Sequence, residues 1–284
     1  MTFLPFQIDL KDRVAVITGG GGVICGAFAE AVAACGAKVA ILDLKQEAAE
    51  SVAKNIQTQG GNAIGIGANV LDTKSLNAAK EEIHRQFGSC DILINGAGGN
   101  HPKGTTTEEF FLPGDETKDE LISFFDLDPD GVSFVFNLNF LGTLLPTQVF
   151  AKDMVEKKDA TIINISSMNA FSPLTKIPAY SGAKAAVSNF TEWLAVHFSK
   201  VGIRVNAIAP GFFVTNQNRH LLFQSDGSLT PRSEKSLSQT PMERFGEVHE
   251  LVGTLLWLLS SDASSFVNGT VIPVDGGFSA YSGV

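Results

Sequence analysis

Residues 13–30 read RVAVITGGGGVICGAFAE, and this stretch decides the fold. A short apolar run rich in Val and Ile predicts a buried strand, and the alanine-rich segment after it has helical spacing. Between the two, the glycines at 19–22 form a turn whose backbone amides can approach a phosphate, with the helix N-terminus adding a favourable dipole. An ordinary flexible turn also uses glycine, so the function of this turn depends on the rest of the chain.

Strand and helix patterns alternate along the whole sequence. The predicted strands are 13–17, 38–43, 63–70, 91–95, 161–166, 203–209 and 270–275. The predicted helices include 27–35, 46–59, 74–87, 179–200 and 247–260. This order predicts an α/β fold: a doubly wound, Rossmann-type sandwich with a seven-stranded, mainly parallel sheet and helices on both faces.

The chain of 284 residues (1–284) is predicted to form one domain, because no linker, repeat or low-complexity tract divides it. Two stretches, 99–131 and 212–245, follow predicted strand ends and interrupt the alternation. Loops of that length are often lids or binding loops. Doubly wound sheets bind ligands at the carboxyl ends of their strands, so we expect both stretches to border a ligand site.

Composition excludes several classes of protein. With 44% hydrophobic and 18% charged residues, the chain can bury a substantial core and is not intrinsically disordered. A formal net charge of −9 disfavours nucleic acid and anionic membranes as partners. The apolar stretch 251–259 is interrupted and falls short of the ~20 residues that span a bilayer, so no transmembrane helix is expected.

We expect a cytoplasmic protein with reduced thiols. No basic residue precedes Lys11, and Pro5 and Gln7 interrupt the apolar core that a signal peptide needs. The cysteines at 25, 35 and 90 lack paired-ligand spacing, so neither a metal site nor a disulfide is predicted.

An acidic residue ends the second predicted strand. Asp43 follows the glycine turn at about the spacing at which a carboxylate accepts hydrogen bonds from the adenosine ribose of a dinucleotide. The same carboxylate repels a 2′-phosphate, and Leu44 rather than an arginine comes next. These residues favour NAD over NADP, and a helix-capping aspartate is the alternative interpretation.

Tyr180 and Lys184 lie four positions apart in a predicted helix, so the phenol and the ammonium share one face. A tyrosine has a pKa near ~10, and a nearby ammonium, helped by an oxidised nicotinamide, favours the phenolate. The pair is a candidate for acid/base catalysis, with a surface helix pair as the alternative. Ser167, at the end of a preceding strand, supports the catalytic interpretation.

At this point the sequence resembles the short-chain dehydrogenase/reductase family over almost its whole length. The matching motifs occur in the family's order: Thr18-Gly19, Asp43, Asn95-Gly96-Ala97-Gly98, Asn139, Ser167, Tyr180 with Lys184, Pro210-Gly211 with Thr215, and Asp275-Gly276-Gly277. The resemblance implies hydride transfer between a nicotinamide and a substrate carbonyl carbon.

The resemblance also implies a role for each of four residues. Tyr180 exchanges the proton at the substrate oxygen, and Ser167 hydrogen-bonds that oxygen. Lys184 lowers the pKa of Tyr180 and holds the nicotinamide ribose, and Asn139 anchors a water that links Lys184 to solvent. A non-catalytic nicotinamide sensor would not need all four, so their presence favours an enzyme.

The cofactor contacts that the resemblance implies follow the strand ends. They are Gly19, Gly21, Gly22, Val23, Ile24, Asp43, Leu44, Asn69, Val70, Asn95, Ala97, Tyr180, Lys184, Pro210, Gly211, Phe213 and Thr215. The first turn departs from the family pattern, because Val23 and Cys25 occupy the positions of its second and third glycines. Either these residues keep ordinary dihedral angles or the turn shifts onto 20–22 and Gly26.

Within the family, residues 95–103, 124–127, 167–171 and 278–284 resemble the bacterial branch that interconverts D-fructuronate and D-mannonate. A sugar acid needs a cation for its carboxylate and polar groups for its hydroxyls. The candidates are Asn100, His101, Lys103, Asn169 and Arg219, with His220 beside the last. A reductase of a deoxy-keto-uronate would use the same residues.

Five phenylalanines leave other substrates open. Phe111, Phe171, Phe212, Phe213 and Phe223 would also suit a pocket for an alcohol, steroid or acyl-thioester, although such residues are more often core or interface. Family members commonly form tetramers through the helices around Asn139 and Tyr180 and through the last strands. The resemblance therefore implies a homotetramer.

Overall fold

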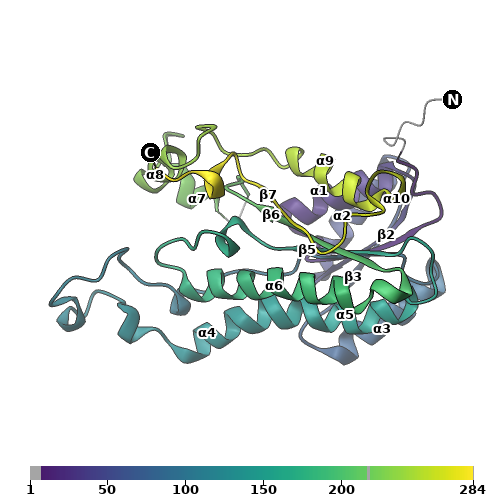
Figure 1. Cartoon of the computed structure of the whole chain (residues 1–284), viewed down its shortest axis with the longest axis horizontal. Coiled ribbons are helices and arrows are strands. Elements are labelled where there is room, and N and C mark those ends of the chain that lie inside the picture. Colours follow the sequence, from purple (N-terminus) through teal and green to yellow (C-terminus); the bar gives the residue numbers. More distant parts are fainter. Residues whose placement is uncertain (1–7, 216–217, 284) are drawn as a thin grey trace.

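The computed structural model describes residues 8–215 and 218–283. Pro5 and Gln7, which underlie the expectation about a signal peptide, lie outside these residues. A seven-stranded sheet with the order β3-β2-β1-β4-β5-β6-β7 forms the centre, and every pair of neighbours is parallel (Figure 1). The strands are β1 (Val14–Thr18), β2 (Lys38–Asp43), β3 (Asn62–Gly67), β4 (Ile92–Asn95), β5 (Thr161–Ile165), β6 (Arg204–Pro210) and β7 (Val271–Val274). The predicted fold class is confirmed.

The parallel register aligns the carboxyl ends of the central strands. All residues of β1, β5 and β6 are buried, as expected for strands covered on both faces. Thr18 pairs with Leu42 on one side and with Asn95 on the other, and Asn95 pairs with Asn164. The turns that follow β1, β4 and β5 therefore meet at one edge of the sheet.

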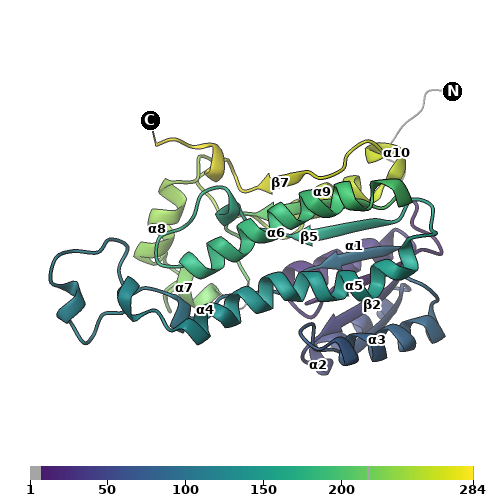
Figure 2. The same ribbon diagram turned by 60° about the horizontal axis from the view of Figure 1, so that its bottom comes forward.

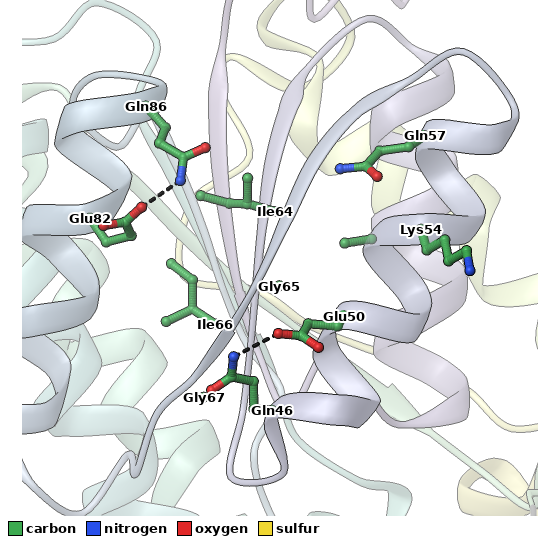
Figure 3. A pocket seen from close by; sticks show the side chains of 11 residues that line it. Gln46, Glu50, Lys54, Gln57, Ile64, Gly65, Ile66, Gly67, Glu82 and Gln86 are labelled. Atoms are coloured by element: carbon green, nitrogen blue, oxygen red, sulfur yellow. Dashed lines mark hydrogen bonds between the residues drawn. The ribbon is translucent and has the colours of Figure 1, made fainter.

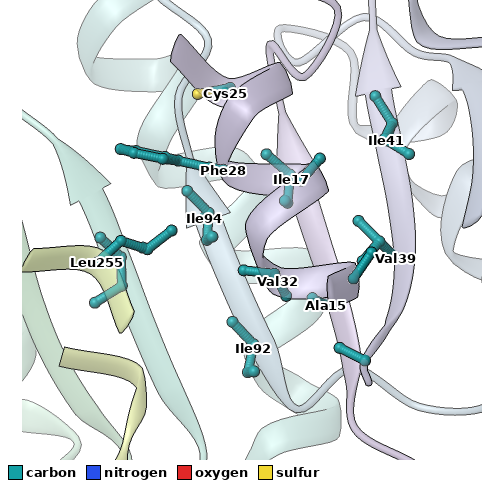
Figure 4. Packing of buried hydrophobic residues seen from close by; sticks show 14 of the residues in the cluster. Ala15, Ile17, Cys25, Phe28, Val32, Val39, Ile41, Ile92, Ile94 and Leu255 are labelled. Atoms are coloured by element: carbon teal, nitrogen blue, oxygen red, sulfur yellow. The ribbon is translucent and has the colours of Figure 1, made fainter. Parts of the chain in front are cut away.

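Helices cover both faces of the sheet. On one face, α1, α2 and α9 bury apolar residues against the strands, and Figure 4 shows Phe28 and Val32 of α1 among Ile17, Ile94 and Leu255. On the other face lie α3, α5 and α6. The helices are α1 (Val23–Ala34), α2 (Gln46–Thr58), α3 (Thr73–Gln86), α4 (Pro129–Phe136), α5 (Gly142–Met154), α6 (Pro178–His197), α7 (Arg219–Leu222), α8 (Pro231–Ser238), α9 (Glu250–Leu259) and α10 (Ser261–Ser264).

Helices α4 and α5 are joined by a π-helical turn, Asn137–Leu141, into one helix, Pro129–Met154. By length and composition alone it is apolar enough to cross a membrane, and 50% of its apolar window is buried. The sequence analysis gave no bounds for this helix, because its apolar side chains are spread over many turns rather than placed in an unbroken run. In the structure it packs along α6 and α3, in the layer over the sheet (Figure 2).

The two stretches that interrupt the alternation differ in structure. Segment 99–131 contains short 3-10 turns and the start of α4, and it projects away from the sheet (Figures 1 and 2). Segment 212–245 carries α7 and α8, which the loop interpretation did not anticipate. An ion pair between Glu109 and Lys235 connects the two segments.

Gly65 provides a test of this packing. A Cβ atom on Gly65 would lie 2.4 Å from the backbone nitrogen of Glu50 and 2.6 Å from the carbonyl oxygen of Ala49, both in α2. Gly65→Ala should therefore push α2 away from β3 and lower the free energy of unfolding by about 1–3 kcal/mol, measured in urea. Gly253→Ala is the matched control, because its Cβ would meet nothing within 4 Å and alanine favours a helix. Equal effects of the two substitutions would contradict this account.

Candidate active site

The glycine turn follows β1 directly and is held close to the turn after β4. Gly19 has φ +64, and a Cβ there would lie 2.8 Å from the nitrogen of Ala97. Gly22 is the N-cap of α1, and no side chain caps that helix. The backbone amides at the start of α1 thus face an edge of the sheet at which two turns meet, which suits a phosphate group.

Val23 and Cys25 keep ordinary dihedral angles, which answers the question raised by the departure from the family pattern. Both belong to α1, and neither is among the residues with positive φ. The thiol of Cys25 packs against the turn after β4: a Cβ on Gly96 would lie 2.1 Å from its Sγ. The start of α1 can still pack closely against the turn after β4, because Gly96 in that turn has no side chain to collide with Cys25. Burial raises the pKa of the Cys25 thiol to about 12.

Asp43 ends β2 and supports the glycine turn. Its Oδ2 accepts a hydrogen bond from the nitrogen of Gly21 at 3.1 Å, and its Oδ1 accepts one from Lys45 at 3.0 Å. Each carboxylate oxygen can accept a further hydrogen bond. Beyond it, Leu44 is 74% exposed. The next strand leads to Asn69, which is exposed, and Val70, which is buried.

The turn after β4 is fixed by Thr18, which the sequence analysis named as part of the Thr18-Gly19 motif without predicting this role. Its Oγ1 accepts hydrogen bonds from the nitrogens of Gly96 (3.1 Å) and Ala97 (3.3 Å). The sequence feature that could have indicated this role is a threonine at the end of β1, which pairs with the end of the parallel strand β4. Asn95 differs from the expected cofactor contact: its side chain is buried and donates to Thr147 and Asn164. Only the backbone of Asn95 faces the turn.

Ser167, Tyr180 and Lys184 meet at the end of β5. The ammonium Nζ of Lys184 donates to the carbonyl of Ile165 at 2.8 Å and lies 5.6 Å from the centre of the Tyr180 ring. Lys184 is buried, which lowers its pKa to about 8. Burial raises the pKa of Tyr180, while a hydrogen bond with Ser167 acts in the opposite direction.

Asn139 lies in the π-helical turn and clamps the backbone after β4. Its Nδ2 donates to the carbonyls of Gly99 and Val135, both at 2.7 Å, and its Oδ1 accepts from the nitrogen of Gly99 at 3.2 Å. A Cβ on Gly98 would lie 2.6 Å from Oδ1 of Asn139 and 3.2 Å from Nζ of Lys184. Asn139 and Lys184 thus border one small space that Gly98 leaves open.

The segment after β6 lines the other side of the strand ends. Pro210 is the last residue of β6, and a Cβ on Gly211 would lie 2.6 Å from the Cα of Asp275, so the chain runs tightly past the end of β7. Phe213 is buried in the core against Gly246, which leaves only its backbone for a ligand. The nitrogen of Thr215 donates to Oδ1 of Asn218 at 2.8 Å.

Four of the five substrate candidates already have partners within the chain. Lys103 forms an ion pair with Asp128 at 2.9 Å. His101 accepts a hydrogen bond from the nitrogen of Lys103, Asn100 donates to Thr105, and the guanidinium of Arg219 lies 5.1 Å from the centre of the Phe223 ring.

The fifth substrate candidate, Asn169, is buried. Its Oδ1 has no hydrogen-bond partner in the part of the chain that the structure describes.

A separate groove of about 630 Å³ lies between α2, β3 and α3 (Figure 3). Its polar walls are paired with one another, as in the hydrogen bond of 2.6 Å from Gln46 to Glu50. None of the predicted site residues lines it. Within residues 8–215 and 218–283, no group of three or more His, Cys, Asp or Glu is placed to hold a metal ion.

Comparisons with known proteins identify the family of this chain. The sequence model described as short chain dehydrogenase matches residues 13–225. The chain belongs to the short-chain dehydrogenase/reductase family and is an NAD(P)-dependent oxidoreductase that acts on alcohol and ketone groups.

Three relatives define its neighbourhood in that family. An uncharacterised oxidoreductase of Haemophilus influenzae is 60% identical over 278 residues, which are 97% of this chain and 96% of that protein. The uncharacterised oxidoreductase UxuB of Bacillus subtilis is 52% identical, over 99% of this chain and 100% of that protein. A Haemophilus influenzae protein with bound NAD, provisionally assigned as a D-mannonate oxidoreductase, superimposes with a TM-score of 0.94 at 58% identity, over 99% of both chains.

The space beside Gly98 generates a prediction. Gly98→Ala should displace the Asn139 amide and the Lys184 ammonium, and lower kcat by about tenfold to 10²-fold, since small misplacements of reacting groups have effects of that size. The measurement is steady-state ketone reduction with NADH. Gly99→Ala is the control, because its Cβ would only contact Leu138 at an ordinary 3.7 Å and should leave kcat unchanged. Similar losses in both variants would refute the role given to this space.

Proposed function

We propose that this chain is an NAD(H)-dependent oxidoreductase that interconverts D-fructuronate and D-mannonate. The choice of substrate rests on the similarity of this chain to the NAD-bound protein provisionally assigned as a D-mannonate oxidoreductase, at 58% identity and a TM-score of 0.94. The geometry of Ser167, Tyr180 and Lys184 supports the chemistry of carbonyl reduction.

The residues at the strand ends fit a dinucleotide. The uncapped start of α1, the bare backbone of Gly19 and Gly22, and the two oxygens of Asp43 offer donors to a pyrophosphate and acceptors to a ribose. The residues proposed to hold NAD are Gly19, Gly21, Gly22, Val23, Ile24, Asp43, Leu44, Asn69, Val70, Ala97, Tyr180, Lys184, Pro210, Gly211 and Thr215, with Asn95 and Phe213 through their backbones. Bound there, the nicotinamide gives or takes a hydride.

Tyr180 is proposed as the proton donor in reduction. Because its pKa is raised, the phenol is protonated at neutral pH and can transfer its proton to the carbonyl oxygen as hydride adds to the carbonyl carbon. Ser167 holds the same oxygen. Lys184, with a pKa of about 8, is mostly protonated at pH 7 and can donate to the nicotinamide ribose. In alcohol oxidation, Lys184 and an oxidised nicotinamide would together favour the phenolate.

The substrate carboxylate is assigned to Arg219 ahead of Lys103. Lys103 is engaged with Asp128, whereas the guanidinium of Arg219 packs on Phe223 and forms no ion pair among the described residues. A guanidinium stacked on an aromatic ring keeps its N–H edges available for a carboxylate. Asn100 and His101 would line the same side. The single domain, the homotetramer and the cytoplasmic location stay predictions of the sequence.

The first test is NADH oxidation by purified protein with D-fructuronate, with NADPH and a deoxy-keto-uronate in parallel. We expect rapid turnover with D-fructuronate and NADH. Reaction with the deoxy-keto-uronate alone would replace the proposed substrate by the competing one. Turnover of neither would refute a keto sugar acid as the substrate.

Tyr180→Phe tests the proton donor. Removing the hydroxyl should lower kcat by at least about 10²-fold, because a positioned acid contributes that much, while the Kd for NADH stays unchanged. Stopped-flow turnover and NADH fluorescence titration measure the two quantities. Retained activity would show that another group supplies the proton.

Asp43→Asn tests cofactor selection. The amide keeps an acceptor and nearly the same shape, but it loses the charge that repels a 2′-phosphate, so the ratio of kcat/KM for NADPH to that for NADH should rise about tenfold. Glu47→Gln is the matched control, since it removes an exposed charge from the first turn of α2 and should not change the ratio. An unchanged ratio in Asp43→Asn would refute the role of Asp43.

A further inference from the structure

One buried acceptor beside the reacting groups lacks a partner. Four side-chain atoms in the described chain are buried without a hydrogen bond: Arg13 Nε, Asn95 Oδ1, Asn169 Oδ1 and Ser181 Oγ. Asn95 belongs to the interior network with Thr147 and Asn164, and Arg13 donates through another nitrogen to Asp159. A serine hydroxyl rotates and serves as donor or acceptor, so Ser181 does not define a ligand. The remaining atom, Asn169 Oδ1, belongs to the residue two positions after Ser167.

Asn169 is tied to Ser167 by the backbone. Its nitrogen donates to Oγ of Ser167 at 3.2 Å; Ser167 is the N-cap of the short turn Met168–Ala170, and Asn169 lies within that turn. The Ser167 hydroxyl, which also hydrogen-bonds Tyr180, is thus held in place by the backbone of Asn169. Two residues apart along a chain, the Cα atoms of Ser167 and Asn169 are separated by at most about 7 Å. Asn169 therefore lies directly beside the residue proposed to hold the reacting oxygen of the substrate.

The unpaired Asn169 Oδ1 lowers the stability of the protein unless a ligand donates a hydrogen bond to it. A buried acceptor without a partner destabilises a protein by about 1–3 kcal/mol. Asn169 is only 5% exposed, so bulk water does not relieve this cost. The other candidates from the sequence, Asn100, His101, Lys103 and Arg219, already have internal contacts.

We propose that the Asn169 side-chain carbonyl accepts a hydrogen bond from a substrate hydroxyl on a carbon adjacent to the reacting carbonyl, and so selects α-hydroxy ketones. The inference rests on the proposed reaction at Ser167 and Tyr180. Asn169 Oδ1 repels a carboxylate, so the acid group of the substrate binds away from Asn169. A site built around such a hydroxyl rejects analogues without it much more strongly than an apolar pocket rejects a small change in size.

The experiment compares D-fructuronate with two analogues, each lacking one of the hydroxyls that flank its ketone. For wild-type protein, one analogue should lose about 10²-fold in kcat/KM. Asn169→Ala should lower kcat/KM for D-fructuronate by a similar factor. It should not lower kcat/KM for that analogue any further, because the variant and the analogue each remove the same hydrogen bond. Asn77→Ala, a remote exposed asparagine of α3, is the matched control and should behave as wild type.

A second variant separates binding from a structural role. Asn169→Asp keeps the acceptor oxygen and should retain more discrimination between the two compounds than Asn169→Ala. The Tm of Asn169→Ala should equal or exceed that of wild type, because its side-chain oxygen has no internal hydrogen bond to lose. Wild-type discrimination in Asn169→Ala would overturn the inference.

The outcome also separates this inference from the proposed function. If wild-type protein reduces other α-hydroxy ketones but not D-fructuronate, and Asn169→Ala abolishes their advantage over plain ketones, the substrate fails and the inference stands. If wild-type protein reduces only ketones without a neighbouring hydroxyl, the inference is overturned. If it reduces D-fructuronate and Asn169→Ala changes nothing, the function stands and the inference fails.

Discussion

The buried ammonium of Lys184 is the constraint on which the site depends. A cation away from water needs oxygen partners, and the carbonyl of Ile165 at the end of β5 supplies one at 2.8 Å. This bond fixes α6 against the sheet and with it the position of Tyr180, one turn earlier in the same helix. The absence of a side chain at Gly98 and the carbonyl-clamping Asn139 leave room around Nζ. The lowered pKa of Lys184 is the electrostatic consequence of that burial.

The turns that follow β1 and β4 pack closely against each other, because at each contact one of the two residues is a glycine. Gly19 approaches the backbone of Ala97, and Gly96 receives the thiol of Cys25. The family pattern places the third glycine in α1; here the space is provided by the turn that α1 packs against. A chain that lacks one glycine of the motif can therefore still pack these two segments closely, provided that the residue facing the replaced glycine has no Cβ, as is the case for Gly96 here.

Much of the architecture could be predicted because it depends on local patterns. The continuous apolar runs predict strands buried on both faces, and the spacing of Tyr180 and Lys184 places both on one side of α6. Side-chain partners depend on contacts between residues far apart along the chain, and local patterns do not predict them. Asn95 turns toward Thr147 in α5, and Lys103 finds Asp128. The bounds of the helix Pro129–Met154 were not predicted, because a helix covering a sheet needs no unbroken apolar run.

The thiols have a consequence for the chemistry of the chain under oxidative conditions. Oxidants and disulfide-exchange partners attack the thiolate, and its fraction at pH 7 falls tenfold for each unit by which the pKa rises. Burial raises the pKa of Cys25 to about 12 and also raises that of Cys90, while Cys35, which is partly exposed, is shifted in the same direction. Cys25, in the first turn of α1, thus acts as a packing residue, and peroxide finds little thiolate there to react with.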